Sequence, residues 1–205
     1  MSDDRFRRIA THLLQGGFIN RQTAPDLFEY LESPDNVAGL RDFLGRLGLT
    51  AALTSNEETW YAALAGITED NRAAARETAA EAKRELRYWV GFLKLAMTAL
   101  DEPAPCAGAT LHAHRLMGAI QDNLNLQETL RTLAQRVRST ADSSLQSLMD
   151  SVLRWAERPE QGLLQLVDEQ RGIYRLSGKV DWVLDMIQAF DESIERPAGP
   201  VRRKA

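Results

Sequence analysis

The segment that most constrains the fold is LGLTAALTSNEETWYAALAG, residues 47–66, which directly follows a helical pattern. Apolar residues alternate over 49–53 and again over 60–64, on either side of the polar sequence SNEE. Such alternation around a tight turn predicts a β-hairpin with one buried face. A hairpin after a helix is typical of the wing in a winged-helix fold, which commonly binds nucleic acid. The turn, however, carries the acidic residues Glu57 and Glu58 and no basic residue, so its tip would repel a phosphate backbone.

The residues before the hairpin complete the winged-helix pattern. Three segments place apolar residues at helical spacing, namely 4–15, 23–32 and 34–47. The short apolar sequence FIN, between the first two, fits a small strand. Thr23 and Ser33 lie just before prolines and are expected to cap the second and third helices. We therefore expect an N-terminal winged helix over residues 1–66.

The next segment, residues 67–110, is expected to link two domains. Its residues 69–101 predict one long helix or two joined helices, and DEPAPCAGAT after them predicts a loop. Within the helix, apolar residues extend around most of the circumference of 86–100, which indicates burial on more than one side. Two alternatives explain these apolar residues: the helix lies in the core of the protein, or it forms an interface with a second copy or another partner. The interface candidates are Trp89, Phe92, Leu93 and Leu95.

After the loop the first pattern returns. Three further helical segments are expected at 111–124, 125–139 and 140–158, the last of them capped by Thr140 or Asp142. A strand, a turn at 168–172 and a second strand follow, and then a final helix from residue 179. We expect a C-terminal winged helix over 111–195 and a flexible basic tail over 196–205. The predicted fold class is mainly α with small β-hairpins, as tandem winged-helix domains joined by linking helices.

Charge bears on nucleic-acid binding. The formal net charge is −4, so no global positive field attracts DNA, and any contact requires a local basic patch. The helix at 34–47 offers few side chains suited to reading bases. The second unit is more basic and could neutralise a few phosphates in weak, non-specific, salt-sensitive binding. The alternative is a solvated protein surface on which the acidic residues Asp168, Glu169 and Asp181 alternate with the basic residues. The DNA-contact candidates are Arg131, Arg136, Arg138, Arg171, Arg175 and Lys179.

Other classes of function have little support in the sequence. The pattern C-x5-H-x-H at Cys106, His112 and His114 has only one close pair of ligands, so we expect surface histidines and no metal. No phosphate-binding or nucleophile motif is present, and we expect neither enzyme activity nor a cofactor. No apolar stretch approaches the roughly 20 residues of a membrane span. Together with the lone cysteine, this favours a cytoplasmic protein without membrane contact.

The opening segment contains LLQGGFI, PDLFEYL and a helical pattern that runs through LGL into a hairpin with an aromatic second strand. These motifs resemble the MukE/MksE family of accessory subunits of bacterial SMC-like condensins. NRAAARETAAEAKRELRYWVGFLKLAMTAL is similar to the linking helices of that family, and LLQLVDEQRGIYRLSGKVDWVLDMI to its closing winged helix.

The resemblance implies a tandem winged-helix homodimer, a kite subunit. Such a subunit binds a MukF/MksF-like kleisin and, through the kleisin, the SMC-like ATPase. The implied function is a non-catalytic, nucleoid-associated role in DNA condensation and chromosome segregation, or in plasmid defence as in Wadjet systems. Because the first hairpin is acidic, we expect the first unit to contact protein and the second to contact DNA. The alternative is a winged-helix transcriptional regulator.

Overall fold

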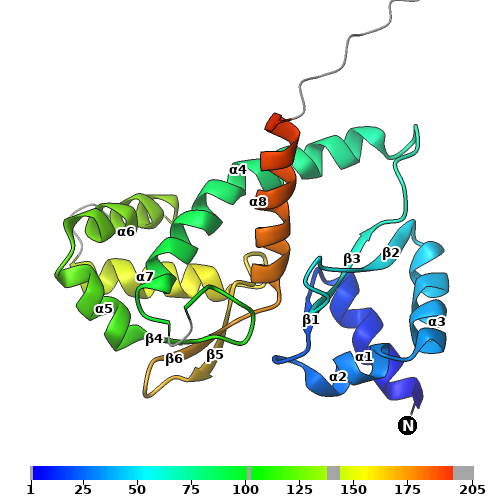
Figure 1. Cartoon of the computed structure of the whole chain (residues 1–205), viewed down its shortest axis with the longest axis horizontal. Coiled ribbons are helices and arrows are strands. Elements are labelled where there is room, and N and C mark those ends of the chain that lie inside the picture. The colour runs from blue at the N-terminus through cyan, green and yellow to red at the C-terminus, as the bar shows by residue number, and fades with distance from the viewer. Residues whose placement is uncertain (1, 101–102, 138–143, 196–205) are drawn as a thin grey trace, which may run out of the picture.

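The chain forms two units, each built from helices around a small antiparallel sheet (Figure 1). The structure is a computed structural model and describes residues 2–100, 103–137 and 144–195. The molecule is mainly helical, as expected. The last helix, α8 (Lys179–Glu195), stands against α4 (Arg72–Met97) and beside the first sheet, and so joins the two units.

The first unit has the expected order of elements. These are α1 (Ser2–Leu14), β1 (Ile19–Asn20), α2 (Pro25–Leu31), α3 (Pro34–Gly45), β2 (Leu49–Leu53) and β3 (Thr59–Leu64). The predicted hairpin is confirmed, since Leu53 lies opposite Trp60. β3 takes the middle of the sheet, in the order β1-β3-β2. Helices and sheet bury one apolar cluster that includes Ile9, Leu13, Ile19, Phe28, Leu31, Leu40, Leu44 and Ala51.

Of the two expected helix caps of this unit, Ser33 is confirmed as the cap residue and Thr23 is wrong. Ala24 occupies the cap position of α2, and the Thr23 hydroxyl is buried without a hydrogen-bond partner among the described residues. Ser33 occupies the cap position of α3 as expected, although its side chain makes no capping hydrogen bond. Asn36 instead donates its amide to the Tyr30 carbonyl at 2.8 Å, which ties the start of α3 to α2.

The second unit has a sheet of the same strand arrangement as the first, but more helices. After α4 come β4 (Thr110–His112), α5 (Ala113–Gln121), α6 (Leu124–Arg136), α7 (Leu145–Glu157), β5 (Leu164–Asp168), β6 (Ile173–Leu176) and α8. Leu166 lies opposite Tyr174, so the second hairpin is confirmed. β6 again takes the middle, in the order β4-β6-β5.

Two details of this unit differ from expectation. Residues 110–112 form a strand rather than the start of a helix, because they pair with 173–175 far along the chain. Helices α6 and α7 are capped by Asn123 and Ser144, whose side chains accept backbone N–H groups. The expected caps Thr140 and Asp142, and the tail 196–205, lie outside the described residues.

Residues 72–97 form a single helix, which decides between one helix and two. Its N-terminal half is largely exposed, whereas Trp89, Phe92, Leu93 and Leu95 are between 0% and 5% exposed in the second core. Trp89 also donates its ring N–H to Gln161 at 2.8 Å. The expectation that these four side chains form a dimer or partner interface is therefore corrected. Their apolar surface is covered by their own chain.

Candidate interaction surfaces

A buried polar cluster joins the two units. Asp181, in the first turn of α8, accepts bonds through Oδ2 from Thr59 Oγ1 at 2.6 Å and from Asn20 Nδ2 at 3.1 Å. Its other oxygen accepts the backbone N–H of Ala107 at 3.3 Å. Asp181, Asn20 and Thr59 are all nearly inaccessible to solvent. Because buried polar groups are costly unless bonded, these contacts favour one orientation of the units.

The turn of the first hairpin is part of the same contact. Ser55 donates its backbone N–H to Asp185 of α8 at 2.9 Å, and its hydroxyl donates to the same carboxylate. Glu58 pairs with Arg21 at 3.1 Å, so one of the two acids of the turn is neutralised within the first unit. The turn that would repel phosphate is thus docked on a helix of its own chain.

Apolar and steric contacts complete this junction. The Phe18 ring lies 5.9 Å from Trp182, which in turn lies 5.7 Å from Trp89 in the second core. At Gly178, an added Cβ would come 2.7 Å from the Thr59 methyl group. Only a glycine at that position lets α8 approach the first sheet so closely.

Lys179 was expected to contact DNA, and the structure corrects this. The residue is 8% exposed, its amine lies 4.7 Å from the centre of the Trp89 ring, and it donates to the Glu160 carbonyl at 3.0 Å. Burial lowers the pKa of Lys179 from 10.5 to about 8, against the opposing effect of Glu85. An amine held in this way cannot reach a phosphate.

Arg136 is exposed but already paired. It donates to Glu85 of α4 at 2.7 Å, and this hydrogen bond and charge raise the pKa of Arg136. Arg136 and Arg87 both lie over the ring of Tyr88, at 5.5 and 4.5 Å from its centre. The second oxygen of Glu85 is buried without a hydrogen-bond partner among the described residues. This cluster links α4 to the end of α6.

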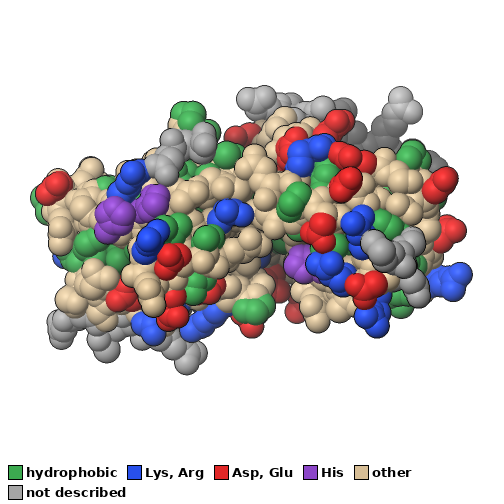
Figure 2. All heavy atoms as spheres, turned by 90° about the horizontal axis from the view of Figure 1, so that it is seen from below, with side chains coloured by type: hydrophobic (Ala, Val, Ile, Leu, Met, Phe, Trp, Pro, Cys, Tyr) green, Lys and Arg blue, Asp and Glu red, His purple; other side chains and the backbone are tan. Residues whose placement is uncertain are grey.

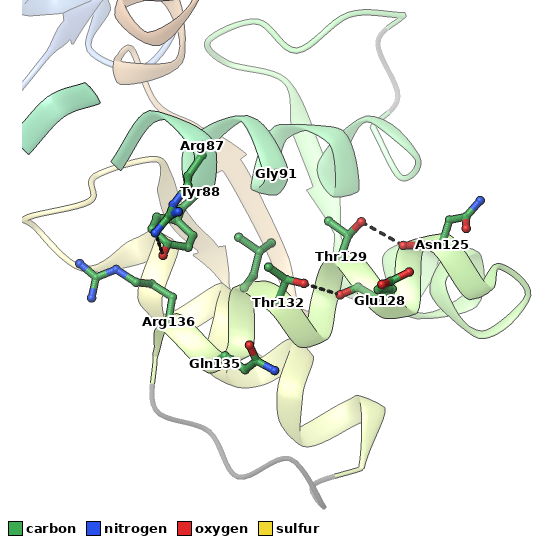
Figure 3. A pocket seen from close by; sticks show the side chains of 10 residues that line it. Arg87, Tyr88, Gly91, Asn125, Glu128, Thr129, Thr132, Gln135 and Arg136 are labelled. Atoms are coloured by element: carbon green, nitrogen blue, oxygen red, sulfur yellow. Dashed lines mark hydrogen bonds between the residues drawn. The ribbon is translucent and has the colours of Figure 1, made fainter. Parts of the chain in front are cut away.

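A groove of about 820 Å³ runs from this cluster between α4 and α6 (Figure 3). Helix α4 contributes Arg87, Tyr88 and Gly91. Helix α6 contributes Asn125, Glu128, Thr129, Thr132, Leu133, Gln135 and Arg136. Polar side chains thus line its α6 wall, while Gly91 leaves space above Leu133. The sequence did not predict this groove, since its α6 residues read as an ordinary solvated face.

The remaining DNA-contact candidates lie on separate elements. Arg131 is exposed on α6, and Arg171 is exposed at the second hairpin, 3.7 Å from Asp168. Arg175 is half-buried on β6, and Arg138 lies outside the described residues. On the face drawn in Figure 2, basic and acidic side chains are interspersed rather than gathered by sign. This distribution suits weak contacts better than a strong positive field.

The histidine motif gives no metal cluster in the part of the chain that the structure describes. The ring centres of His112 and His114 lie 5.5 Å apart with the ring planes inclined by 59°. No group of three or more potential ligand residues is found within 2–100, 103–137 and 144–195. Over these same residues, no helix is both long enough and apolar enough to cross a membrane.

Comparison with known proteins places this architecture in a family. No match was found among curated protein sequences. The family model of the condensin complex protein MksE matches residues 4–186, and so covers both units, α4 and the polar cluster at Asp181. The chain therefore belongs to the MksE family of condensin complex proteins.

Proposed function

We propose that this chain is a non-catalytic accessory subunit of an SMC-like condensin, and that its two units are winged-helix domains in tandem. The repeated order of elements supports this, as does the central position of the last strand in both sheets. The first domain spans 1–66. Because half of α4 packs in the second core, we place the start of the second domain within α4 rather than at residue 111.

The partner that we propose is the kleisin subunit, bound by a homodimer of this chain, with the SMC-like ATPase held through the kleisin. The observation that carries this proposal is the family match over 4–186. The docked first hairpin supports a role in protein contact, because its turn bonds to Asp185 and is not free to lie on DNA. The proposed location is the cytoplasm, on the nucleoid.

DNA contact, in this proposal, is weak and non-specific. Arg131 and Arg171 of the second domain supply part of it. A transcriptional regulator would need a helix that reads bases, and α3 is the helix before the first hairpin. Arg41 of α3 instead donates to the Ala51 carbonyl at 3.1 Å and lies over Trp60. That arginine is engaged with its own hairpin, which disfavours the regulator alternative.

Co-expression with the kleisin-like and SMC-like proteins of the same cell tests the proposal. We expect the three to co-purify, and we expect light scattering of the chain alone to give twice its 23.0 kDa mass. A chain that runs alone and selects one short duplex sequence from a random pool at physiological salt would favour the regulator. Comparison of chromosome segregation with plasmid retention in a deletion strain separates maintenance from defence.

A further inference from the structure

We propose that the groove between α4 and α6 receives an amphipathic helix of the kleisin-like partner, with an acidic side chain of that helix at the Arg87 end. The inference rests on the proposed function and deepens it, since it assigns the partner to one surface. The groove has a volume of about 820 Å³, which is room for several side chains of a partner.

The floor of the groove admits a side chain from outside. Gly91 of α4 faces Leu133 of α6, and a Cβ at Gly91 would lie 3.4 Å from the nearest Leu133 methyl group. That is an ordinary contact, so the glycine is not required for the packing of α4 on α6. It leaves unfilled space at the middle of the groove, where an apolar side chain of a partner helix fits.

The α6 wall of the groove has the length and pattern of a helix-binding surface. Its lining residues run from Asn125 to Arg136 at steps of three and four, so they form one face of α6. At roughly 1.5 Å per residue, this face extends about 16 Å, or about three helical turns. Thr129 and Thr132 donate their hydroxyls to carbonyls of their own helix, which leaves their oxygens able to accept bonds (Figure 3).

The two ends of the groove differ in charge, and this selects the occupant. Arg87, Arg136 and Tyr88 lie at one end, and Glu128 lies toward the other (Figure 3). Arginine and tyrosine side chains are the types that most often dominate binding energy at interfaces. Glu85 compensates Arg136, which leaves Arg87 as the cation that an incoming carboxylate meets.

The chain's own tail is a poor occupant by the same criterion. The sequence RPAGPVRRKA, residues 196–205, contains four basic residues and no acidic side chain to pair with Arg87. It also holds two prolines and a glycine, which disfavour a three-turn helix. A helix from a separate chain, with an acid at one end and apolar residues along one face, matches the groove better.

Binding of the full-length chain to the full-length kleisin-like subunit of its complex tests the assignment. We expect Arg87→Glu and Gly91→Leu each to raise the dissociation constant by about tenfold or more, since they reverse the cation and fill the floor. The matched control is Arg76→Glu, which reverses an exposed arginine of the same helix outside the groove. We expect this control to stay within about twofold of the unmodified chain. Circular dichroism and the thermal midpoint verify that each variant is folded.

The outcomes separate this inference from the proposed function. If the unmodified chain binds the kleisin-like subunit and all three variants bind equally well, the groove is not the site and the proposed function stands. If the unmodified chain does not bind, both are overturned. If Arg87→Glu instead converts a dimer of this chain to a monomer in light scattering, the occupant is a second copy, and the assignment to the kleisin is wrong. If Gly91→Leu fails to fold, the comparison of Arg87→Glu with its arginine control tests the assignment of the groove.

Discussion

Replacement of Asp181 by alanine tests the buried junction between the two units. The substitution removes the acceptor of three donors that lie on three separate segments, namely Asn20, Thr59 and the backbone of Ala107. The Asn20 amide keeps a second acceptor, the Glu58 carbonyl at 3.0 Å. The Thr59 hydroxyl and the Ala107 N–H lose the carboxylate that accepts from them.

The expected cost follows from these two orphaned donors. A buried donor left unsatisfied costs about 1–3 kcal/mol, so the two donors predict that Asp181→Ala lowers the free energy of unfolding by about 2–6 kcal/mol. The junction also couples the units, and its loss should separate their transitions. We expect one cooperative urea transition in the unmodified chain and two in the variant, because the first unit no longer docks on α8.

The four tryptophans make the assay specific to each unit. Trp60 lies in the first core, and Trp89, Trp155 and Trp182 lie in or against the second. A Trp60→Phe background therefore reports the second unit by fluorescence, while circular dichroism at 222 nm reports both. In Asp181→Ala, the two signals should no longer coincide.

A double-mutant cycle with Asn20→Ala adds a control. The hydrogen bond of Asn20 to the carboxylate at 3.1 Å predicts a coupling energy of about 1–2 kcal/mol with Asp181→Ala. The reasoning is refuted if Asp181→Ala changes the free energy of unfolding by less than about 0.5 kcal/mol and the transitions still coincide. That result would mean that the cluster does not hold the units together.

Three further predictions concern other parts of the second unit. Lys179→Met should raise the free energy of unfolding at pH 7 by up to about 3 kcal/mol, because it removes the cost of a buried charge. This gain in stability should shrink between pH 8 and pH 10.5, because in that range Lys179 of the unmodified chain is protonated when unfolded and neutral when folded, so the folded unmodified chain becomes more stable as the pH rises. Urea unfolding of both proteins at pH 7.5 and pH 10 measures the change. A difference in stability that is the same at both pH values refutes the prediction. Trp89→Ala should cost about 3–5 kcal/mol in urea unfolding if its ring belongs to the core, and a loss below about 1 kcal/mol would return it to an interface. Reversal of Arg171 and Arg175 to glutamate should weaken DNA retention by the assembled complex without a change in oligomeric state; unchanged retention at low and moderate salt excludes the second hairpin from DNA contact.

Local patterns were sufficient to predict most elements of the fold. The alternation around SNEE predicted the first hairpin, and Leu53 does pair with Trp60 across it. The periodicity of the helices likewise predicted their existence. The strand at 110–112 could not be seen in this way, because three residues carry no period and their pairing with 173–175 is distant in sequence.

The surfaces were harder to predict, for a related reason. Lys179 and Asp181 follow a turn and begin a helix, a position that in most chains is solvated. Asp181 is buried because Asn20 and Thr59 of the first sheet, more than a hundred residues earlier, bond to it. Lys179 is buried against Trp89 and Glu160, which also lie far from it in the sequence. The groove at Gly91 depends on how α4 and α6 pack, which the sequence of neither helix specifies.

The central claim is that this member of the MksE family acts by holding protein partners rather than by reading DNA. The most direct measurement is the affinity of the unmodified full-length chain for its kleisin-like subunit, compared with its affinity for duplex DNA in the same buffer at physiological salt. The account predicts stable kleisin binding, and DNA binding that is weak, independent of sequence and lost as salt rises. Tight, sequence-selective duplex binding with no affinity for the kleisin-like subunit contradicts it.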